Sequence, residues 1–198
     1  MKKISLFISA ILMATTIFTS CEDEILPIDN GQTDNYDVYR FSKSLSYNST
    51  NPNEQSAFCA RSQQTVAASS GDADICAGWQ NQYGYFLCSP NASLLKDCYD
   101  ANGKNYSNPN RTKIKSLGSA DIEDYSDVNS LENLYVSSEN IDGKSSLGNG
   151  VNQLSVGQVI AFETGDGCKG VAQVSNHSKV SKTITITGYV AVPKNSAK

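Results

Sequence analysis

The sequence predicts an all-β domain, or a β-rich one with one or two short helices, built from antiparallel sheets arranged as a sandwich. Beyond residue 35 the apolar runs are short, and turn-forming residues recur between them. Over residues 183–187, Thr and Ile alternate strictly, which places both isoleucines on one face of a strand. Because no internal repeat divides the chain, we expect a single β-rich domain over residues 36–198.

The C-terminal part of the chain carries the clearest strand signals. An apolar stretch over 156–164 is followed by the turn Gly165-Asp166-Gly167 and a second strand-like run over 169–175, a pattern typical of a β-hairpin. After Thr183–Thr187 the chain passes Gly188 and continues as a strand. We therefore expect a C-terminal three-stranded meander with one buried side.

Three earlier segments also have strand character: 38–41, 74–79 and 83–89. The polar residues 80–82 join the last two, so these two predict a hairpin. Cys76 and Cys88 fall on its two strands, where a cross-strand disulfide is geometrically conceivable.

The region between Leu94 and Val136 has a mixed pattern. Gly103, Pro109 and Gly118 interrupt it, which argues against long elements. Residues 130–135 predict a short helical turn opened by Ser130.

The first 20 residues have the three parts of a secretory signal peptide: basic Lys2 and Lys3, an apolar run over 4–18 and a small-residue end. The run is shorter than the roughly 20 residues of a spanning helix. It ends at Phe18-Thr19-Ser20-Cys21, which looks like a bacterial lipobox. We predict that Cys21 becomes the first mature residue and carries diacylglycerol on its thiol and an acyl chain on its amine. The alternative is ordinary secretion with Cys21 in a disulfide.

Residues 21–35 are polar and lack periodicity, which predicts a flexible acidic tether between the lipid and the domain. The acidic residues 22–24 directly after Cys21 resemble the signal that sends lipoproteins of Bacteroidetes to the outer face of the outer membrane. By charge alone they form only a short solvated patch. We expect a lipid-anchored outer-membrane protein that faces the cell exterior, with a periplasmic orientation left open.

Cleavage before Cys21 leaves 198 − 20 = 178 residues, with 14 basic and 20 acidic side chains and a net charge of −6. Such a mildly acidic chain without a Lys/Arg-rich stretch excludes nucleic acid as the expected partner.

The mature domain has five cysteines besides Cys21, in a compartment that we expect to be oxidising: Cys59, Cys76, Cys88, Cys98 and Cys168. Five thiols allow at most two intrachain disulfides and leave one thiol over, and the sequence does not determine which pairs form. No C-x-x-C motif is present and His177 is the only histidine, so we expect no metal site.

Several short segments occur in an order that resembles the HmuY-type haem-binding lipoproteins of Bacteroidetes. They are the lipoprotein start, Phe41-Ser42-Lys43, Asp72-Ala73-Asp74-Ile75, the 159–170 segment with its Asp166-Gly167 turn, and Thr183–Thr187. The resemblance covers about a third of the mature chain. It implies an all-β domain displayed on the cell surface.

The sequence departs from that family in the residues that ligate haem iron. Members use two axial histidines or, in some relatives, methionines, whereas here His177 is single and Met1 and Met13 lie in the signal peptide. Tyr phenolate can ligate haem iron, and several tyrosines lie in the central region, but half-buried sheet positions explain them more simply. We expect no cofactor and keep haem binding only as a minor alternative.

The sequence also lacks the common catalytic signatures. G-x-S-x-G, H-E-x-x-H, the Walker loop and G-x-G-x-x-G are all absent. The acidic groups over 121–127 are spaced along one polar stretch, which favours a solvated loop or a weak calcium site over a glycosidase pair, and they lack the residue order of an EF-hand. We predict a protein that is not an enzyme.

Two non-catalytic functions remain. In the first, the domain binds a small molecule, a glycan or a protein partner, and Trp79, Tyr83 and Tyr85 form the candidate ligand platform. In the second, it is a structural or adhesive module whose Asn/Ser-rich stretches 47–53 and 106–110 contact other macromolecules. An exposed Trp79 beside the two tyrosines favours the first function.

Overall fold

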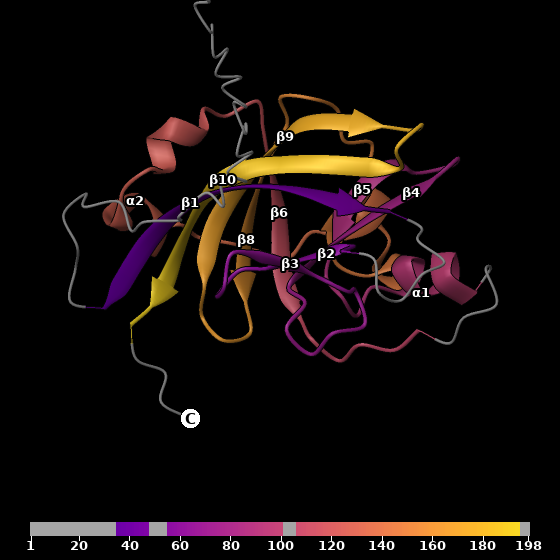
Figure 1. Ribbon diagram of the computed structural model, residues 1–198, viewed down its shortest axis with the longest axis horizontal. Coiled ribbons are helices and arrows are strands. Elements are labelled where there is room, and N and C mark those ends of the chain that lie inside the picture. The colour runs from indigo at the N-terminus through magenta and orange to yellow at the C-terminus, as the bar shows by residue number, and fades with distance from the viewer. Residues whose placement is uncertain (1–34, 48–54, 101–105, 195–198) are drawn as a thin grey trace, which may run out of the picture.

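The computed structural model describes residues 35–47, 55–100 and 106–194, which form a β-sandwich of two five-stranded antiparallel sheets (Figure 1). The fold class predicted from the sequence is therefore confirmed. The signal peptide, Cys21 and the tether up to residue 34 lie outside the described residues, so lipidation stays a prediction. Within the described ranges, no helix is long and apolar enough to cross a membrane.

The first sheet, called sheet A here, has the strand order β1-β10-β9-β8-β6. Its strands are β1 (Tyr36–Ser46), β6 (Thr112–Gly118), β8 (Val159–Thr164), β9 (Lys169–Ser178) and β10 (Thr183–Pro193). The predicted meander is confirmed as β8–β9–β10. The alternation in β10 is also confirmed, since Ile184 and Ile186 are buried while the neighbouring threonines are partly exposed.

The second sheet, sheet B, has the order β3-β2-β4-β5-β7. Its strands are β2 (Ala57–Cys59), β3 (Gln64–Val66), β4 (Ile75–Gln80), β5 (Gly84–Cys88) and β7 (Gly150–Val151). The predicted hairpin of residues 74–89 corresponds to β4 and β5. The sequence did not predict β2, β3 and β7, because strands of two or three residues are too short to show an alternating pattern.

Aromatic rings join the two sheets at the centre of the sandwich. Phe41 of β1 stacks on Phe58 of β2 with a centroid distance of 4.3 Å, and Phe58 meets Phe162 of β8 edge to face at 6.4 Å. All three rings belong to the core cluster that lies between the sheets. This contact fixes one end of sheet B against the middle of sheet A.

Short helices cover the outer faces of both sheets. The 3-10 helix η1 (Ile122–Tyr125) and helix α2 (Val128–Glu132) pack on sheet A, and helix α1 (Ser93–Asp100) packs on sheet B; α1 and α2 appear on opposite sides of Figure 1. Two more 3-10 turns, η2 (Ile141–Gly143) and η3 (Ser145–Leu147), precede β7.

This covering corrects two expectations. The meander has more than one buried side, because Val171 and Tyr189 face outward from the sandwich core and are buried under η1 and α2. The helical turn expected over 130–135 instead begins at Val128, with Asp127 as its N-cap accepting from the Ser130 amide over 2.9 Å.

Candidate functional site

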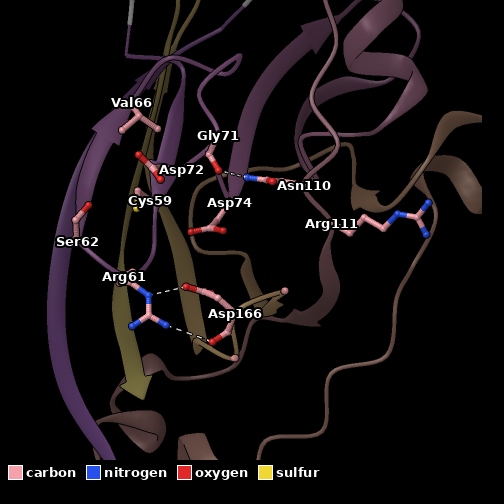
Figure 2. A pocket seen from close by; sticks show the side chains of 12 residues that line it. Cys59, Arg61, Ser62, Val66, Gly71, Asp72, Asp74, Asn110, Arg111 and Asp166 are labelled. Carbon is pink, nitrogen blue, oxygen red and sulfur yellow. Dashed lines mark hydrogen bonds and ion pairs between the residues drawn. The ribbon is translucent and has the colours of Figure 1, made fainter. Parts of the chain in front are cut away.

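A polar cavity of about 1060 Å³ opens at one end of the sandwich, where loops of both sheets meet (Figure 2). Four segments build it: the β2–β3 hairpin, the loop that enters β4, the segment before β6 and the β8–β9 turn. Its lining is mostly polar and holds three carboxylates and two guanidinium groups: Cys59, Arg61, Ser62, Val66, Gly71, Asp72, Asp74, Asn110, Arg111, Gly165, Asp166 and Gly167.

The β8–β9 turn positions Asp166. The amide of Thr164 donates to the carbonyl of Cys168 over 2.9 Å, and the amide of Cys168 donates to the Thr164 hydroxyl over 2.9 Å, so the three residues between them form a tight loop. Gly167 closes that loop with φ of +87°, a conformation that favours glycine. The Thr164 hydroxyl also donates to Asp166, which orients its carboxylate toward the cavity.

Arg61 of the β2–β3 hairpin pairs with Asp166 across the cavity (Figure 2). Its Nε donates to Oδ2 of Asp166 over 2.6 Å, and its Nη2 lies 3.3 Å from the Asp166 carbonyl oxygen. Burial would raise the pKa of Asp166, but the hydrogen bonds from Thr164 and Arg61 outweigh it and hold that pKa below its ordinary value. The charge of Arg61 is thus already compensated by the protein.

Asp74 is a mostly buried carboxylate that accepts a single hydrogen bond from the residues that the structure describes. The Ala60 amide donates to its Oδ2 over 2.8 Å, and no other group in the described part of the chain donates to this carboxylate. Burial raises its pKa from 3.8 to about 6; the Ala60 hydrogen bond opposes the shift, Asp166 and Asp72 add to it, and Arg61 lowers the pKa. Asp74 therefore sits in the cavity wall with acceptor capacity that a bound group can use.

The segment 106–110 fixes the loop that leads to Asp74. Tyr106 donates to the Pro90 carbonyl over 2.7 Å, Asn108 donates to the carbonyls of Ala68 and Ser70, and Asn110 donates to those of Gly71 and Ala73. Tyr106 and Asn108 are consequently buried, whereas Ser107 and Pro109 of this stretch are exposed; residues 48–53 of the other stretch lie outside the described residues.

The three residues of the predicted aromatic platform do not share one surface. Tyr83 is buried in the cluster beneath α1, whereas Tyr85 is buried in the core between the sheets. Trp79 is half-buried against that core, 6.4 Å from the ring of Tyr47, with Lys179 Nζ 5.1 Å above its face.

His177 lies beside this aromatic group. Its ring stacks on Tyr85 with a centroid distance of 4.1 Å, and it is half-buried. The position of His177 is fixed by β9, which extends to Ser178 and carries this residue within sheet A. No cluster of three or more His, Cys, Asp or Glu side chains that could hold a metal ion occurs in the described ranges.

All five cysteines of the domain are buried, and the structure has no disulfide among them. Cys76, Cys88 and Cys98 share the cluster beneath α1, and Cys76 lies directly opposite Cys88 in the β4–β5 ladder. Cys59 lines the polar cavity, and Cys168 follows the turn that carries Asp166. The expectation of two disulfides and one remaining thiol stays a prediction.

The acidic residues over 121–127 have structural roles that sequence reasoning left open. Asp121 and Asp127 cap η1 and α2, and Glu123 accepts a 2.6 Å hydrogen bond from the hydroxyl of Tyr189. These interactions attach the η1–α2 segment to sheet A.

Sequence reasoning missed the residues that give the cavity its chemistry. In the sequence, Asp74 indicates only the start of a strand and Asp166 only a hairpin turn, and no local pattern marks Arg61 as a functional residue. A signal was present for Asp166, since an aspartate in a hairpin turn with glycines on both sides projects from the edge of a sheet.

We compared the chain with models of known protein families, with curated proteins and with solved structures, and none of the three comparisons yields a significant match.

Proposed function

We propose that this protein is a lipid-anchored, non-catalytic binding module of the cell envelope, displayed on the outer membrane, and that it holds a small polar ligand in the cavity between Arg61, Asp74 and Asp166. The lipobox at Cys21 and the acidic residues behind it support the anchoring and display. The observation that carries the binding function is the position of Asp74, a mostly buried carboxylate that faces a cavity of about 1060 Å³.

The environment of Asp74 supports a binding role over a purely structural one. Burial makes the charged form of its carboxylate unfavourable in the folded protein. A carboxylate that only supported the fold would be expected to have its charge satisfied, as Asp166 has through Thr164 and Arg61. The cavity volume is at the upper end of the range of about 300 to 1000 Å³ that is typical of small-molecule sites.

The adhesive alternative has less support, since Tyr106 and Asn108 of one expected contact stretch are buried and hydrogen-bonded inside the domain. Haem binding also has less support, because His177 already stacks on Tyr85.

Filling the cavity tests the proposed function. A Cβ placed on Gly71 meets nothing within 4 Å, so a side chain can start at this position of the cavity lining, and Gly71→Phe adds a ring there. Val156→Phe, at an exposed position ahead of β8, is the matched control. The full-length lipoproteins are released from native membranes in mild detergent and analysed by native mass spectrometry. We expect a non-covalent small molecule on the wild type and on Val156→Phe but not on Gly71→Phe; equal retention by both variants, or none by the wild type, would contradict the proposal.

Anchoring is tested separately with Cys21→Ser. We expect the wild type to incorporate labelled palmitate and to be cut when intact cells are treated with protease, whereas the variant incorporates no label. Labelling of the variant would contradict lipidation at Cys21, and protection of the wild type from protease would contradict surface display.

A further inference from the structure

The polar cavity contains more negative than positive side chains. Its lining has three carboxylates, Asp72, Asp74 and Asp166, and two guanidinium groups, Arg61 and Arg111. Arg61 is paired with Asp166, and in Figure 2 the side chain of Arg111 points away from Asp74. The part of the cavity around Asp74 therefore carries an excess negative charge.

The hydrogen-bond arrangement around Asp74 defines what kind of group can compensate this charge. Oδ2 is used by the Ala60 amide, which leaves Oδ1 as the open acceptor. Two backbone carbonyls near it are already occupied, because the Asn110 amide holds those of Gly71 and Ala73. A single open carboxylate oxygen suits a compact cation with rotatable donors better than a planar guanidinium fork, which prefers two oxygens.

We propose that the ligand of this cavity carries a primary ammonium group, which pairs with Asp74. The inference rests on the proposed binding function and specifies its ligand class. The Arg61–Asp166 pair then forms a neutral wall that accepts the polar remainder of the ligand, and Val66 supplies an apolar contact. An anionic ligand is disfavoured beside Asp74, because Arg61, the cation that acts on this carboxylate, is already paired with Asp166.

An ammonium group is found both in free amines and in lysine side chains, so the test has two arms. The full mature chain is titrated by calorimetry at pH 7 with putrescine and with the neutral 1,4-butanediol, and in parallel with acetyl-Gly-Lys-Gly-amide and acetyl-Gly-Gln-Gly-amide. We expect at least one ammonium probe to bind ten-fold or more tightly than its neutral partner. The arm with the larger difference identifies the source as a free amine or a peptide.

Two isosteric variants make the test specific for Asp74. Asp74→Asn should weaken binding of the ammonium probe at least ten-fold, whereas Asp97→Asn, at an exposed position of α1 outside the cavity lining, should leave it unchanged. Because Asp74→Asn removes a buried charge, the variant is expected to fold at least as stably as the wild type, which thermal unfolding checks directly.

Proton competition provides a further readout. Arg61, Asp72 and Asp166 are the charged groups that act on Asp74, and burial and the two acidic neighbours together raise its pKa to about 6. Wild-type affinity should therefore fall about ten-fold between pH 7 and pH 5, as Asp74 takes up a proton.

Equal binding of charged and neutral probes, no binding of either ammonium probe, or unchanged affinity in Asp74→Asn would overturn the inference. The cavity-filling variant Gly71→Phe keeps the two proposals apart. If that variant loses the native small molecule while Asp74→Asn retains it, the binding function stands and the ammonium assignment fails.

Discussion

The two sheets of the sandwich are held by different kinds of interaction. In sheet A, β1 and β10 are eleven residues long and pair from Tyr36 opposite Pro193 to Ser46 opposite Thr183. In sheet B the longest strand, β4, has six residues and β7 has two. Sheet A is stabilised mainly by long main-chain ladders, whereas sheet B depends on side chains that fix its loops and on the α1 layer that covers it.

The same contrast explains where the cavity lies. Long ladders satisfy the main-chain groups of sheet A internally, while the loops of sheet B need side-chain donors such as Asn108 and Asn110 for their carbonyls. Loops that are fixed in this way hold polar side chains at defined positions, which a binding site requires. The cavity accordingly forms at the end of sheet B, where it meets the one sheet A turn that carries an aspartate.

Each sheet also has one phenylalanine that lies across a cross-strand glycine. Phe162 covers Gly170 in sheet A, and Phe86 covers Gly78 in sheet B; a Cβ on either glycine would come within 2.4 Å of the ring. Phe162 faces the core between the sheets, and Phe86 faces the layer under α1.

The largest expected effects are at these two rings. Since both are fully buried, Phe162→Ala and Phe86→Ala should each lower the free energy of unfolding by about 3 to 5 kcal/mol, as measured by urea denaturation. A cost for Phe86→Ala below half of that for Phe162→Ala would show that the α1 layer is packed less tightly than the core between the sheets.

The cysteines provide the next largest effect for a single interaction. We expect one disulfide within the group Cys76, Cys88 and Cys98, and the other between Cys59 of sheet B and Cys168 beside the sheet A turn. Each bridge contributes about 2 to 4 kcal/mol, so reduction should destabilise the oxidised protein by several kcal/mol. Peptide mapping without reductant identifies the pairs, and thiol titration in denaturant should find one thiol; a bridge between the two groups would contradict the assignment.

Asp74→Asn should stabilise the fold while it weakens ligand binding. The folded state raises the pKa of Asp74 to about 6, so it binds this proton more tightly than the unfolded chain does. The stability that the Asp74 proton contributes to the wild type is thus fully present below about pH 4 and is lost as the pH rises through about 6. At pH 7 the variant should gain about 3 kcal/mol, and the gain should nearly vanish near pH 4.

Thermal unfolding of the wild type and both variants, Asp74→Asn and the control Asp97→Asn, from pH 4 to pH 7 measures this difference. A wild-type advantage at pH 7 would mean that the charged form of Asp74 supports the fold, and the cavity would then lose its main functional argument.

The smallest effect is expected for Arg61→Gln, which removes the ion pair between the two sheets. Both side chains are more than a third exposed, so the pair should contribute only about 0.5 kcal/mol and less at high salt. Chemical denaturation at 0.05 and 1 M NaCl checks this value. A loss above 2 kcal/mol would show that this pair, and not the aromatic core, holds the sheets together.

Strand prediction succeeded where a pattern repeats along one element and failed where it does not. The alternation in Thr183–Thr187 and the Gly165–Gly167 turn identified β8, β9 and β10. In β6, Thr112 and Ile114 alternate with lysines, which is a strand pattern. Pro109 and Gly118 flank this pattern and obscured it in the sequence. Helix α1 was missed because its apolar face is short and becomes evident only against sheet B.

The candidate site could not be predicted from the sequence in the same way. The sequence pointed to Trp79, Tyr83 and Tyr85 by residue type, but neighbours in a hairpin can enter different cores, and Tyr83 and Tyr85 do so. Arg61 and Asp166 are more than a hundred positions apart, and only the packing of sheet B on the sheet A turn brings them together.

The sequence by itself therefore determined the β-rich class and the C-terminal meander, because each depends on a local and repeated pattern of residue types. The lipobox at Cys21 stays a prediction. The tertiary structure alone decided which polar side chains face a common cavity and which of their charges are compensated. The physical reason is that compensation depends on distance and burial. Asp74 lies in the loop before β4, and Asp166 lies in the turn after β8. The pKa of Asp74 is raised and that of Asp166 is lowered, because only Asp166 accepts hydrogen bonds from Thr164 and Arg61.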